Sequence, residues 1–424
     1  MDELVYWIWL SLACSVGGST FSSLMEKYGS AKAIYEAYPE DLYKLVGYRN
    51  SDRGKLADKS LDKALEIYDF CKKYKVGILA YSDERYPQQL RDISSPPVLL
   101  YYRGVLPDFN SAFSVACVGT RALSDYGRKS ALKICYDLSL SGATVISGMA
   151  SGIDGVSHAA ALHAGGITVA VLGSGIDVCY PQQHQHLARE IVKKGCVLTE
   201  YPPKTPPNRY NFPKRNRIIS GLADAILVIE GKEKSGAYIT ASYAKEQGRL
   251  VYALPGNVSS SNSELSNLLI KNGAKLCTCA DDIVRDFLDK YPGVINPFNL
   301  PKVSKIDCLT VLSEYKVVAV CPSDDIFIPS YNHPIKVATK KPDIVHNKKK
   351  ESGFPANEHK SIDPPEGFDI NALRIYKLIP QERDIDVESL TSDEMSLRMV
   401  MSALLKLEMG GFIKMLPSGR VARK

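Results

Sequence analysis

The chain of 424 residues lacks the patterns that mark a disulfide framework, a metal site or a membrane span. Its ten cysteines form no CxxC pair, so neither a zinc ribbon nor a thioredoxin-type site is predicted. The histidines at 158, 163, 184 and 186 lack the spacing of metal ligands, and no apolar run approaches the roughly 20 residues that span a bilayer. We therefore expect no cofactor, no membrane partner and reduced thiols, as in a cytosolic protein.

The apolar segment 4–13 could be mistaken for the core of an export signal. It follows Asp2 and Glu3 and no positive charge, which argues against export and for a cytoplasmic location.

The sequence also lacks the usual signatures of a nucleotide-dependent enzyme. No GxxxxGK[ST] loop is present, and the run from Gly173 to Val178 has no third glycine for a dinucleotide fingerprint. No nucleophile stands beside a plausible base. Asp154, His158 and Asp177 could form an acid–base set, but we interpret the two aspartates as caps of free N–H groups. We therefore predict that the protein is not an enzyme.

What the sequence does have is a local excess of positive charge. The net charge of +6 is small, and residues 1–106 balance 14 basic against 14 acidic side chains, whereas residues 200–250 hold nine against five. Five basic residues and no acidic one fall between Lys204 and Arg217, a segment we call the basic strip. Its prolines favour an extended chain, and Tyr210 and Phe212 lie within it. Cations bind phosphates and aromatic rings stack on exposed bases, so the strip suits single-stranded nucleic acid. The alternative is a solvated surface loop.

The hydrophobic periodicity divides the chain into four parts. Residues 1–78 show short helical patterns, and residues 79–290 begin with a bridge to residue 109 and continue as strands alternating with helices. The charge-free strands predict a doubly wound parallel sheet of the Rossmann type. Residues 291–366 combine an ambiguous segment with a polar, flexible linker. Residues 367–424 show three helical patterns and a terminal hairpin, the order of a winged helix.

Glycine-containing loops follow several of the predicted strands. Because ligands of a parallel α/β sheet bind at the carboxyl ends of its strands, we expect these loops to share one rim. Small residues admit phosphate oxygens to the backbone, and helix N-termini offer free N–H groups. The loops begin at Gly119, Ser147, Gly173, Lys204 and Glu230.

Five blocks in this region closely resemble the DprA/Smf family of bacterial DNA-processing proteins, and the resemblance extends from about Pro96 to Ile283. The N-terminal helices resemble that family's sterile-alpha-motif-like domain, and the C-terminal part resembles its winged helix. The blocks are Gly119-Thr-Arg121, Ser147-Gly-Met-Ala-Ser-Gly-Ile-Asp154, Phe212-Pro-Lys-Arg-Asn-Arg-Ile-Ile-Ser-Gly221, Lys234-Ser-Gly-Ala237 and Ala253-Leu-Pro-Gly256.

The resemblance implies a protein that binds single-stranded DNA without sequence preference and dimerises through its Rossmann domain. It also implies protection of incoming DNA and loading of the RecA recombinase during natural transformation. The DNA-binding positions that it implies are Gly119, Thr120, Arg121, Ser147, Gly148, Arg209, Phe212, Lys214, Arg215, Asn216, Arg217, Lys234, Ser235 and Gly236. We expect Arg121 and Arg215 to face one groove, and Phe212 to stack on a base.

The chain departs from the family pattern at three places. Thr120 stands where serine is usual, Leu265 stands where a glycine is usual, and the linker before the winged helix is long. Thr120 retains a hydroxyl group, whereas Leu265 is expected to alter a turn.

Two other functions remain open at this stage. The Rossmann region more distantly resembles the LOG phosphoribohydrolases, but Lys-Ser-Gly-Ala replaces their glycine-rich motif and the glutamate that follows is missing. The second alternative is a duplex DNA regulator acting through the winged helix. Its candidate recognition helix, residues 396–408, offers only Arg398 and Lys406 as cations, fewer than sequence-specific readers usually present.

Overall fold

A computed structural model describes residues 2–46, 52–300 and 306–318 of the chain. It also describes residues 375, 376, 378, 379, 385, 386, 390, 400, 403, 404, 407, 408, 412–415 and 420–423. The chain divides into two compact units, residues 1–334 and 335–424, and each is described by itself.

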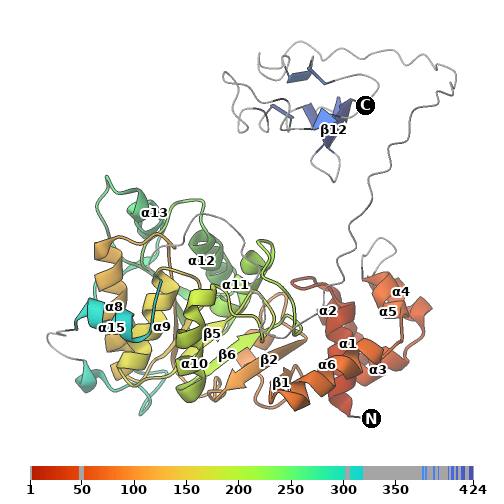
Figure 1. Cartoon of the computed structure of the whole chain (residues 1–424), viewed down its shortest axis with the longest axis horizontal. Coiled ribbons are helices and arrows are strands. Elements are labelled where there is room, and N and C mark those ends of the chain that lie inside the picture. The colour runs from red at the N-terminus through yellow and green to blue at the C-terminus, as the bar shows by residue number, and fades with distance from the viewer. Residues whose placement is uncertain are drawn as a thin grey trace, which may run out of the picture. The chain divides into compact units, whose positions relative to one another are not determined.

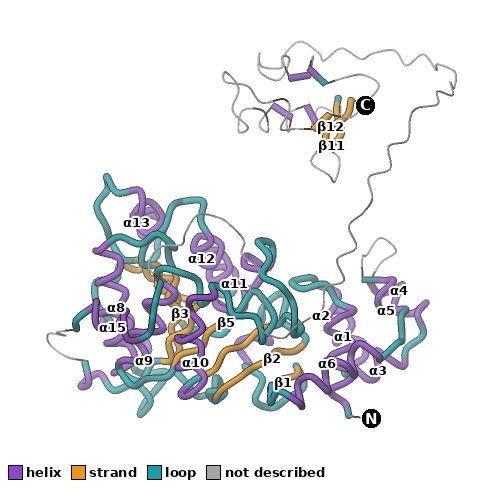
Figure 2. The backbone as a smooth tube through the Cα atoms, viewed as in Figure 1, coloured by secondary structure: helices purple, strands orange, loops and turns teal. Residues whose placement is uncertain are grey.

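The first unit is built on a sheet of nine strands in the order β1-β2-β6-β5-β4-β3-β7-β8-β9 (Figures 1 and 2). Seven strands run parallel, which confirms the predicted doubly wound α/β fold. They are β3 Ser114–Val118, β4 Thr144–Ser147, β5 Thr168–Val171, β6 Cys196–Thr199, β7 Ala225–Val228, β8 Leu250–Ala253 and β9 Lys275–Leu276.

Two antiparallel strands extend this sheet at the β6 edge. β1 (Gly77–Ala80) pairs with β2 (Leu99–Gly104), and β2 pairs with β6. Between them lies the short helix α7 (Gln88–Arg91). The sequence predicted a bridge here that ends in an extended run at residues 96–104, and this run contains β2. Strand β1 was not predicted, because it is only four residues long.

Helices cover both faces of the sheet, and the strands alternate their side chains between them. On β3, Val115 and Cys117 pack in the cluster with α8, α9 and α10, whereas Ala116 and Val118 pack with α11, α12 and α13. This period of two is what a strand buried on both faces requires. The helices are α8 Asp125–Leu140, α9 Ile153–His163, α10 Gln185–Lys194, α11 Asn211–Gly221, α12 Gly236–Glu246 and α13 Glu264–Lys271.

The sequence predicted a helix at 215–222, but helix α11 begins four residues earlier, at Asn211. Asn208 starts a turn in which its backbone oxygen accepts from the Asn211 nitrogen at 2.9 Å and its side chain accepts from the Tyr210 nitrogen at 3.0 Å. Pro213 falls within the first helical turn, where no intrahelical N–H bond is lost. Phe212 and Lys214 therefore lie on the first turn of a helix and not in an extended loop.

The N-terminal region consists of six helices in the described residues. Helix α1 buries Trp7, Ile8 and Leu10, so the apolar segment 4–13 is a packed helix in a core shared with the sheet. None of the described helices has the length and apolarity needed to cross a membrane. The helices are α1 Glu3–Ala13, α2 Thr20–Tyr28, α3 Ala31–Glu36, α4 Pro39–Val46, α5 Arg53–Ala57 and α6 Asp62–Lys73.

The segment after β9 returns to the α8–α9 face. Helix α15 (Cys308–Glu314) packs against both helices, and Val318 bonds to the loop that precedes α9. The remaining short elements of this unit are η1 Gln182–His184, η2 Ser261–Ser263, α14 Asp281–Val284, η3 Arg285–Phe287 and η4 Pro297–Asn299.

The second unit contains a three-stranded antiparallel sheet in the order β10-β12-β11. Strands β11 (Ile413–Met415) and β12 (Arg420–Arg423) form the predicted terminal hairpin, and β10 (Ile385–Asp386) adds a strand that the sequence did not predict. A small core includes Ile375, Leu404 and Val421. The predicted linker at 333–366 lies outside the described residues, as do most residues of the predicted helix 396–408, so the winged helix stays a prediction.

Candidate nucleic-acid interface

The loops after β3 and β7 meet at the point where the strand order reverses. The Thr120 nitrogen donates to the Glu230 backbone oxygen at 2.8 Å. A Cβ on Gly119 would lie 2.9 Å from that oxygen and 2.6 Å from Ile153, so only glycine permits this approach. Helix α8 leaves β3 on one face and α12 leaves β7 on the other. This is the crevice in which open α/β sheets bind their ligands.

The side chain of Glu230 fixes the loop that presents Arg121. Its carboxylate accepts from the Ser124 nitrogen at 3.0 Å and from the Ser124 hydroxyl at 2.5 Å, and Ser124 caps α8. On the other side, Gly152 lies against the backbone of Thr120 and Arg121, where a Cβ would meet the Thr120 oxygen at 2.4 Å. Arg121 is exposed at the tip of this supported loop.

A cluster of aromatic and cationic side chains lies on the same rim. The Phe212 ring is half-buried and packs on Gly173, where a Cβ would lie 2.8 Å from the ring. The ring centroid of Tyr180 is 5.5 Å from that of Phe212, and the Arg121 guanidinium carbon lies 5.6 Å from the Phe212 centroid. We call Arg121, Tyr180 and Phe212 the aromatic cluster. Tyr180 was absent from the predicted positions, although it ends the loop after β5.

Arg215 is buried behind the Phe212 ring, with 4% of its surface exposed. Its Nη1 donates to the Gly148 oxygen at 2.8 Å and to the Val171 oxygen. Burial lowers the pKa of Arg215 to about 10, and the nearby Asp154 acts against that shift. The sequence placed Arg215 facing a groove with Arg121, but the structure uses it to join α11 to the ends of β4 and β5.

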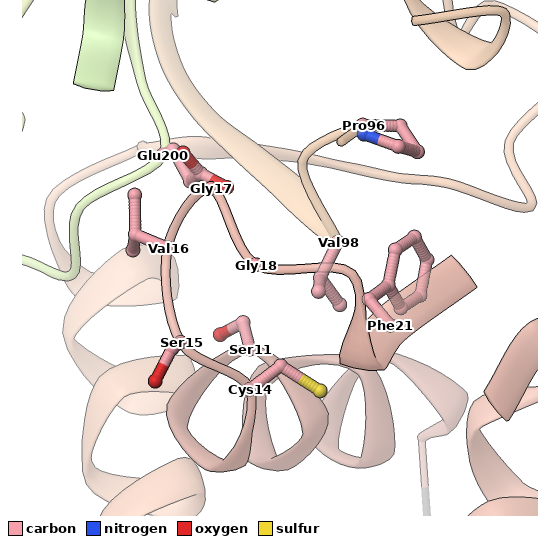
Figure 3. A pocket seen from close by; sticks show the side chains of 10 residues that line it. All are labelled: Ser11, Cys14, Ser15, Val16, Gly17, Gly18, Phe21, Pro96, Val98 and Glu200. Carbon is pink, nitrogen blue, oxygen red and sulfur yellow. The ribbon is translucent and has the colours of Figure 1, made fainter. Parts of the chain in front are cut away.

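Arg217 points to the opposite side of α11 and is 3% exposed. Its Nη2 donates to both carboxylate oxygens of Glu200 at 2.7 and 2.8 Å. The ion pair lies beside the turn at Gly17 and Gly18, which with Glu200 lines a small pocket against α1 (Figure 3). A direct contact between Arg217 and DNA is therefore not available in this structure.

Asn216, Ser147 and Gly148 also serve internal contacts. Asn216 is 8% exposed and donates to the Gly236 oxygen at 3.1 Å, which joins α11 to the start of α12. The buried Ser147 hydroxyl donates to the Cys117 oxygen at 2.6 Å. A Cβ on Gly148 would lie 2.7 Å from both Arg215 and Asp154. These residues shape the rim without presenting their side chains on it.

Four predicted cations do reach the surface. Arg209 stacks on the exposed ring of Tyr210, with its guanidinium carbon 4.9 Å from the ring centroid. The others are Arg121, Lys214 on α11 and Lys234 in the loop after β7. Ser235 precedes α12 and is half-buried beside Gly231, and Gly236 is exposed as the first residue of the helix. The accessible part of the site thus comprises the aromatic cluster, which includes Arg121, the three other cations and the N-terminus of α12.

Leu265, where the family usually has glycine, fills a space beside the same rim. It is fully buried, and a Cβ on Gly231 would lie 2.9 Å from its side chain. The Leu265 nitrogen donates to the Gly231 oxygen at 2.9 Å, so this hydrogen bond fixes the loop after β7 to the start of α13.

Asp154 and Asp177, the two acids of the possible acid–base set, stabilise loops. Asp154 accepts from the nitrogens of Gly148 and Ala150 at 3.1 and 3.3 Å, and burial raises its pKa. Asp177 accepts from the Lys204 nitrogen at 2.7 Å. Both carboxylates therefore bind backbone N–H groups, as interpreted from the sequence. These N–H groups belong to loops and not to the first turn of a helix. Across residues 2–46, 52–300 and 306–318, no cluster of potential ligands could hold a metal ion.

His158 should make stability depend on pH. Its Nδ1 lies 2.7 Å from the Thr168 hydroxyl, and burial, with His184 and Arg215 nearby, lowers its pKa to about 3. In the unfolded chain, His158 has a pKa near 6.5, so as the pH falls it is protonated there before it is protonated in the folded protein. The free energy of unfolding therefore keeps its full value above about pH 6.5 and decreases as the pH falls toward 3. We expect a loss of roughly 1.4 kcal/mol per pH unit from this one group. Urea titrations at several pH values should show a smaller slope in His158→Gln, and an unchanged slope would contradict this assignment.

Comparison with known proteins agrees with this architecture. The sheet and its crevice define a Rossmann-like α/β protein, and the model of the DNA recombination-mediator protein A family matches residues 77–288, half of the chain. The DNA processing protein DprA of Bacillus subtilis is 37% identical over 223 residues, which cover 53% of this chain and 75% of that protein. DprA of Streptococcus pneumoniae is 43% identical over 205 residues, covering 48% and 72%. The chain therefore belongs to the DNA recombination-mediator protein A family, as the sequence blocks predicted.

A solved structure gives the same result for the fold. The X-ray structure of DprA from Streptococcus pneumoniae superposes with a TM-score of 0.58 at 34% identity, covering 68% of this chain and 98% of that one.

Proposed function

We propose that this protein binds single-stranded DNA, without sequence preference, along the rim formed by the loops after β3, β5, β6 and β7. The observation that carries the proposal is the aromatic cluster together with the exposed cations of α11 and of the loops after β6 and β7. Arg121, Lys214 and Lys234 offer charge to phosphates, and the faces of Phe212 and Tyr180 offer stacking surfaces to bases.

The same arrangement disfavours a duplex. Bases of a duplex are stacked on each other, so their faces are not free to contact Phe212 or Tyr180. The protein groups on the rim include backbone N–H groups at the start of α12 and guanidinium groups, which bind phosphate whatever the sequence. Binding should therefore select a single strand over a duplex and tolerate any base.

Arg121 offers the sharpest test of the site. Arg121→Ala should weaken binding to a single-stranded oligonucleotide by about 10- to 150-fold, because a charge-assisted contact contributes about 1.5–3 kcal/mol. The midpoint of urea unfolding should stay at the wild-type value, since the side chain is exposed. Fluorescence anisotropy gives the affinity.

Arg85→Ala is the matched control for the loss of one exposed guanidinium. Arg85 pairs with Asp83 in the segment between β1 and α7, which is not one of the proposed rim loops. Wild-type affinity in Arg121→Ala, or an equal loss in Arg85→Ala, would show that this rim is not the binding site.

We further propose that the bound strand is protected and delivered to the RecA recombinase. Membership of a family of recombination mediators supports this role. The protein should accelerate RecA filament formation on single strands already covered by a single-strand-binding protein. Equal filament-formation rates with and without the protein would contradict the role in loading.

A homodimer through the Rossmann domain is proposed on the apolar character of the β8–β9 edge. Leu250 is 38% exposed, Leu276 on the edge strand β9 is 51% exposed, and Tyr238 of α12 is 44% exposed. An open strand edge with exposed apolar side chains is typical of a surface that pairs with another copy. Light scattering should give twice the chain mass at micromolar concentration.

We propose that the protein binds DNA without altering it chemically. Asp154 and Asp177 are engaged by backbone N–H groups, which leaves neither in a catalytic arrangement. Release of free base from nucleoside monophosphates would favour the phosphoribohydrolase alternative. Tighter binding to duplex than to single strand would favour a regulator acting through the C-terminal unit.

A further inference from the structure

The turn from Gly173 to Gly175, directly after β5, connects the aromatic cluster to a second group of aromatic and basic side chains. Phe212 packs on Gly173 at one end of this turn. At the other end, a Cβ on Gly175 would lie 2.9 Å from the Lys204 nitrogen, and the Gly175 nitrogen donates to the Thr205 oxygen at 2.9 Å. A single residue, Ser174, separates the glycines, so Phe212 and Lys204 lie on the two ends of one short turn.

Lys204 is held in an unusual backbone conformation that directs it toward helix α6. Its φ of +66° is rarely adopted by a residue with a side chain, and its nitrogen is fixed by Asp177. The Lys204 ammonium lies 5.8 Å from the centroid of the Phe70 ring and 3.2 Å from Glu66. Backbone strain of this kind persists where the surroundings enforce it and is enriched at binding sites.

Helix α6 carries aromatic rings and cations on the side where Lys204 lies. Phe70 and Tyr74 stand one turn apart with centroids 4.5 Å from each other, and Tyr74 is 45% exposed. The Lys73 ammonium lies 5.4 Å from the Tyr74 centroid. The combination of rings and cations found in the aromatic cluster is therefore repeated by three residues at the end of α6 and by Lys204 of the loop after β6.

We propose that Phe70, Lys73, Tyr74 and Lys204 form a second subsite for single-stranded DNA, which continues the strand from the aromatic cluster across the Gly173–Gly175 turn. The inference rests on the proposed binding of single strands at the rim. Residues 1–106 carry equal numbers of basic and acidic side chains, but this balance is an average over the whole segment. At this place the acid Glu66 is engaged by Lys204.

The Lys204–Glu66 ion pair does not prevent binding. Both side chains are about two-thirds exposed, and an exposed pair of this kind contributes little and is screened by salt. A phosphate can compete for the ammonium group. Glu66 then remains as a negative charge beside the strand, so removing it should strengthen binding, which a purely structural role for Glu66 would not predict.

Oligothymidylates of two lengths separate this subsite from the rim. A strand of about three nucleotides is confined to the aromatic cluster, whereas one of about 20 reaches both subsites. Tyr74→Ala and Lys204→Gln should each weaken binding of the long strand by at least about fivefold and leave the short strand unaffected. Glu66→Gln should strengthen binding of the long strand. Tyr38→Ala, which removes another exposed tyrosine of the N-terminal helices, is the control and should bind both lengths like the wild type.

The two proposals fail in different ways. If Tyr74→Ala, Lys204→Gln and Glu66→Gln all bind the long strand like the wild type, the second subsite is wrong while binding at the rim stands. An equal loss for both strand lengths would also overturn the second subsite, because it would indicate a disturbed rim. If the wild-type protein binds neither strand, the proposed function fails and this inference with it.

Discussion

Replacing Arg217 with methionine should lower the free energy of unfolding by about 3–5 kcal/mol, because it leaves the Glu200 carboxylate buried without its partner. The side chains of Arg217 and Glu200 are 4% and 7% exposed, and Arg217 donates to both carboxylate oxygens of Glu200. Because the pair is buried, water does not replace the contact that the substitution removes. The midpoint of urea unfolding measures this loss. The DNA affinity of the folded fraction should stay close to the wild-type value.

Two variants make this prediction specific. Arg217→Met combined with Glu200→Leu removes the isolated charge and should recover most of the lost stability. Lys214→Ala, one helical turn away and exposed on the same helix, should leave stability unchanged and weaken DNA binding. Loss of DNA affinity at full stability in Arg217→Met would contradict the structural role and favour direct contact with DNA.

Phe212→Leu should weaken binding to single-stranded DNA by about 5- to 150-fold, since a base stacked on an aromatic ring contributes roughly 1–3 kcal/mol. The ring is half-buried between Gly173 and Tyr180, so part of it fills the sheet rim and part is available for stacking. Leucine retains the apolar volume but lacks a flat face. The melting temperature should therefore change little, while anisotropy with an oligonucleotide should show the loss of affinity.

Phe298→Ala is the control for the loss of an exposed ring, because Phe298 is 94% exposed in η4. It should change neither affinity nor melting temperature. If Phe212→Leu binds like the wild type and Phe212→Ala melts at a much lower temperature, Phe212 is a core residue and not a stacking platform.

The sequence predicted the sheet because its central strands are short charge-free runs between helical patterns. The patterns predicted strands at 113–118 and 143–147 and a helix at 126–140, and the boundaries of β3, β4 and α8 each differ from these by one residue. Strand β1 was missed, and the extended run predicted at 96–104 was not assigned to the sheet, because β2 joins the sheet by pairing with β6. This contact spans about a hundred residues, which local pattern does not encode. The start of α11 was misplaced because the prolines before it were taken to keep the segment extended up to Arg215.

The roles of neighbouring basic residues could not be read from the sequence. Lys214, Arg215 and Arg217 are consecutive or nearly so, yet on a helix they point in different directions. Lys214 is exposed, whereas Arg215 binds carbonyl groups at the ends of β4 and β5 and Arg217 pairs with Glu200. A count of positive charges therefore overestimated the number of groups available to phosphate, and only the fold distinguished them.

The salt dependence of binding to a single strand and to the matching duplex tests the central claim most directly. With phosphate contacts at Arg121, Arg209, Lys214 and Lys234, the logarithm of the affinity for the single strand should fall against the logarithm of salt concentration with a slope of about −3. The single strand should bind more tightly than the duplex at every salt concentration, with similar affinities for unrelated sequences. Equal affinity for both forms, or an affinity that salt does not change, would contradict the account.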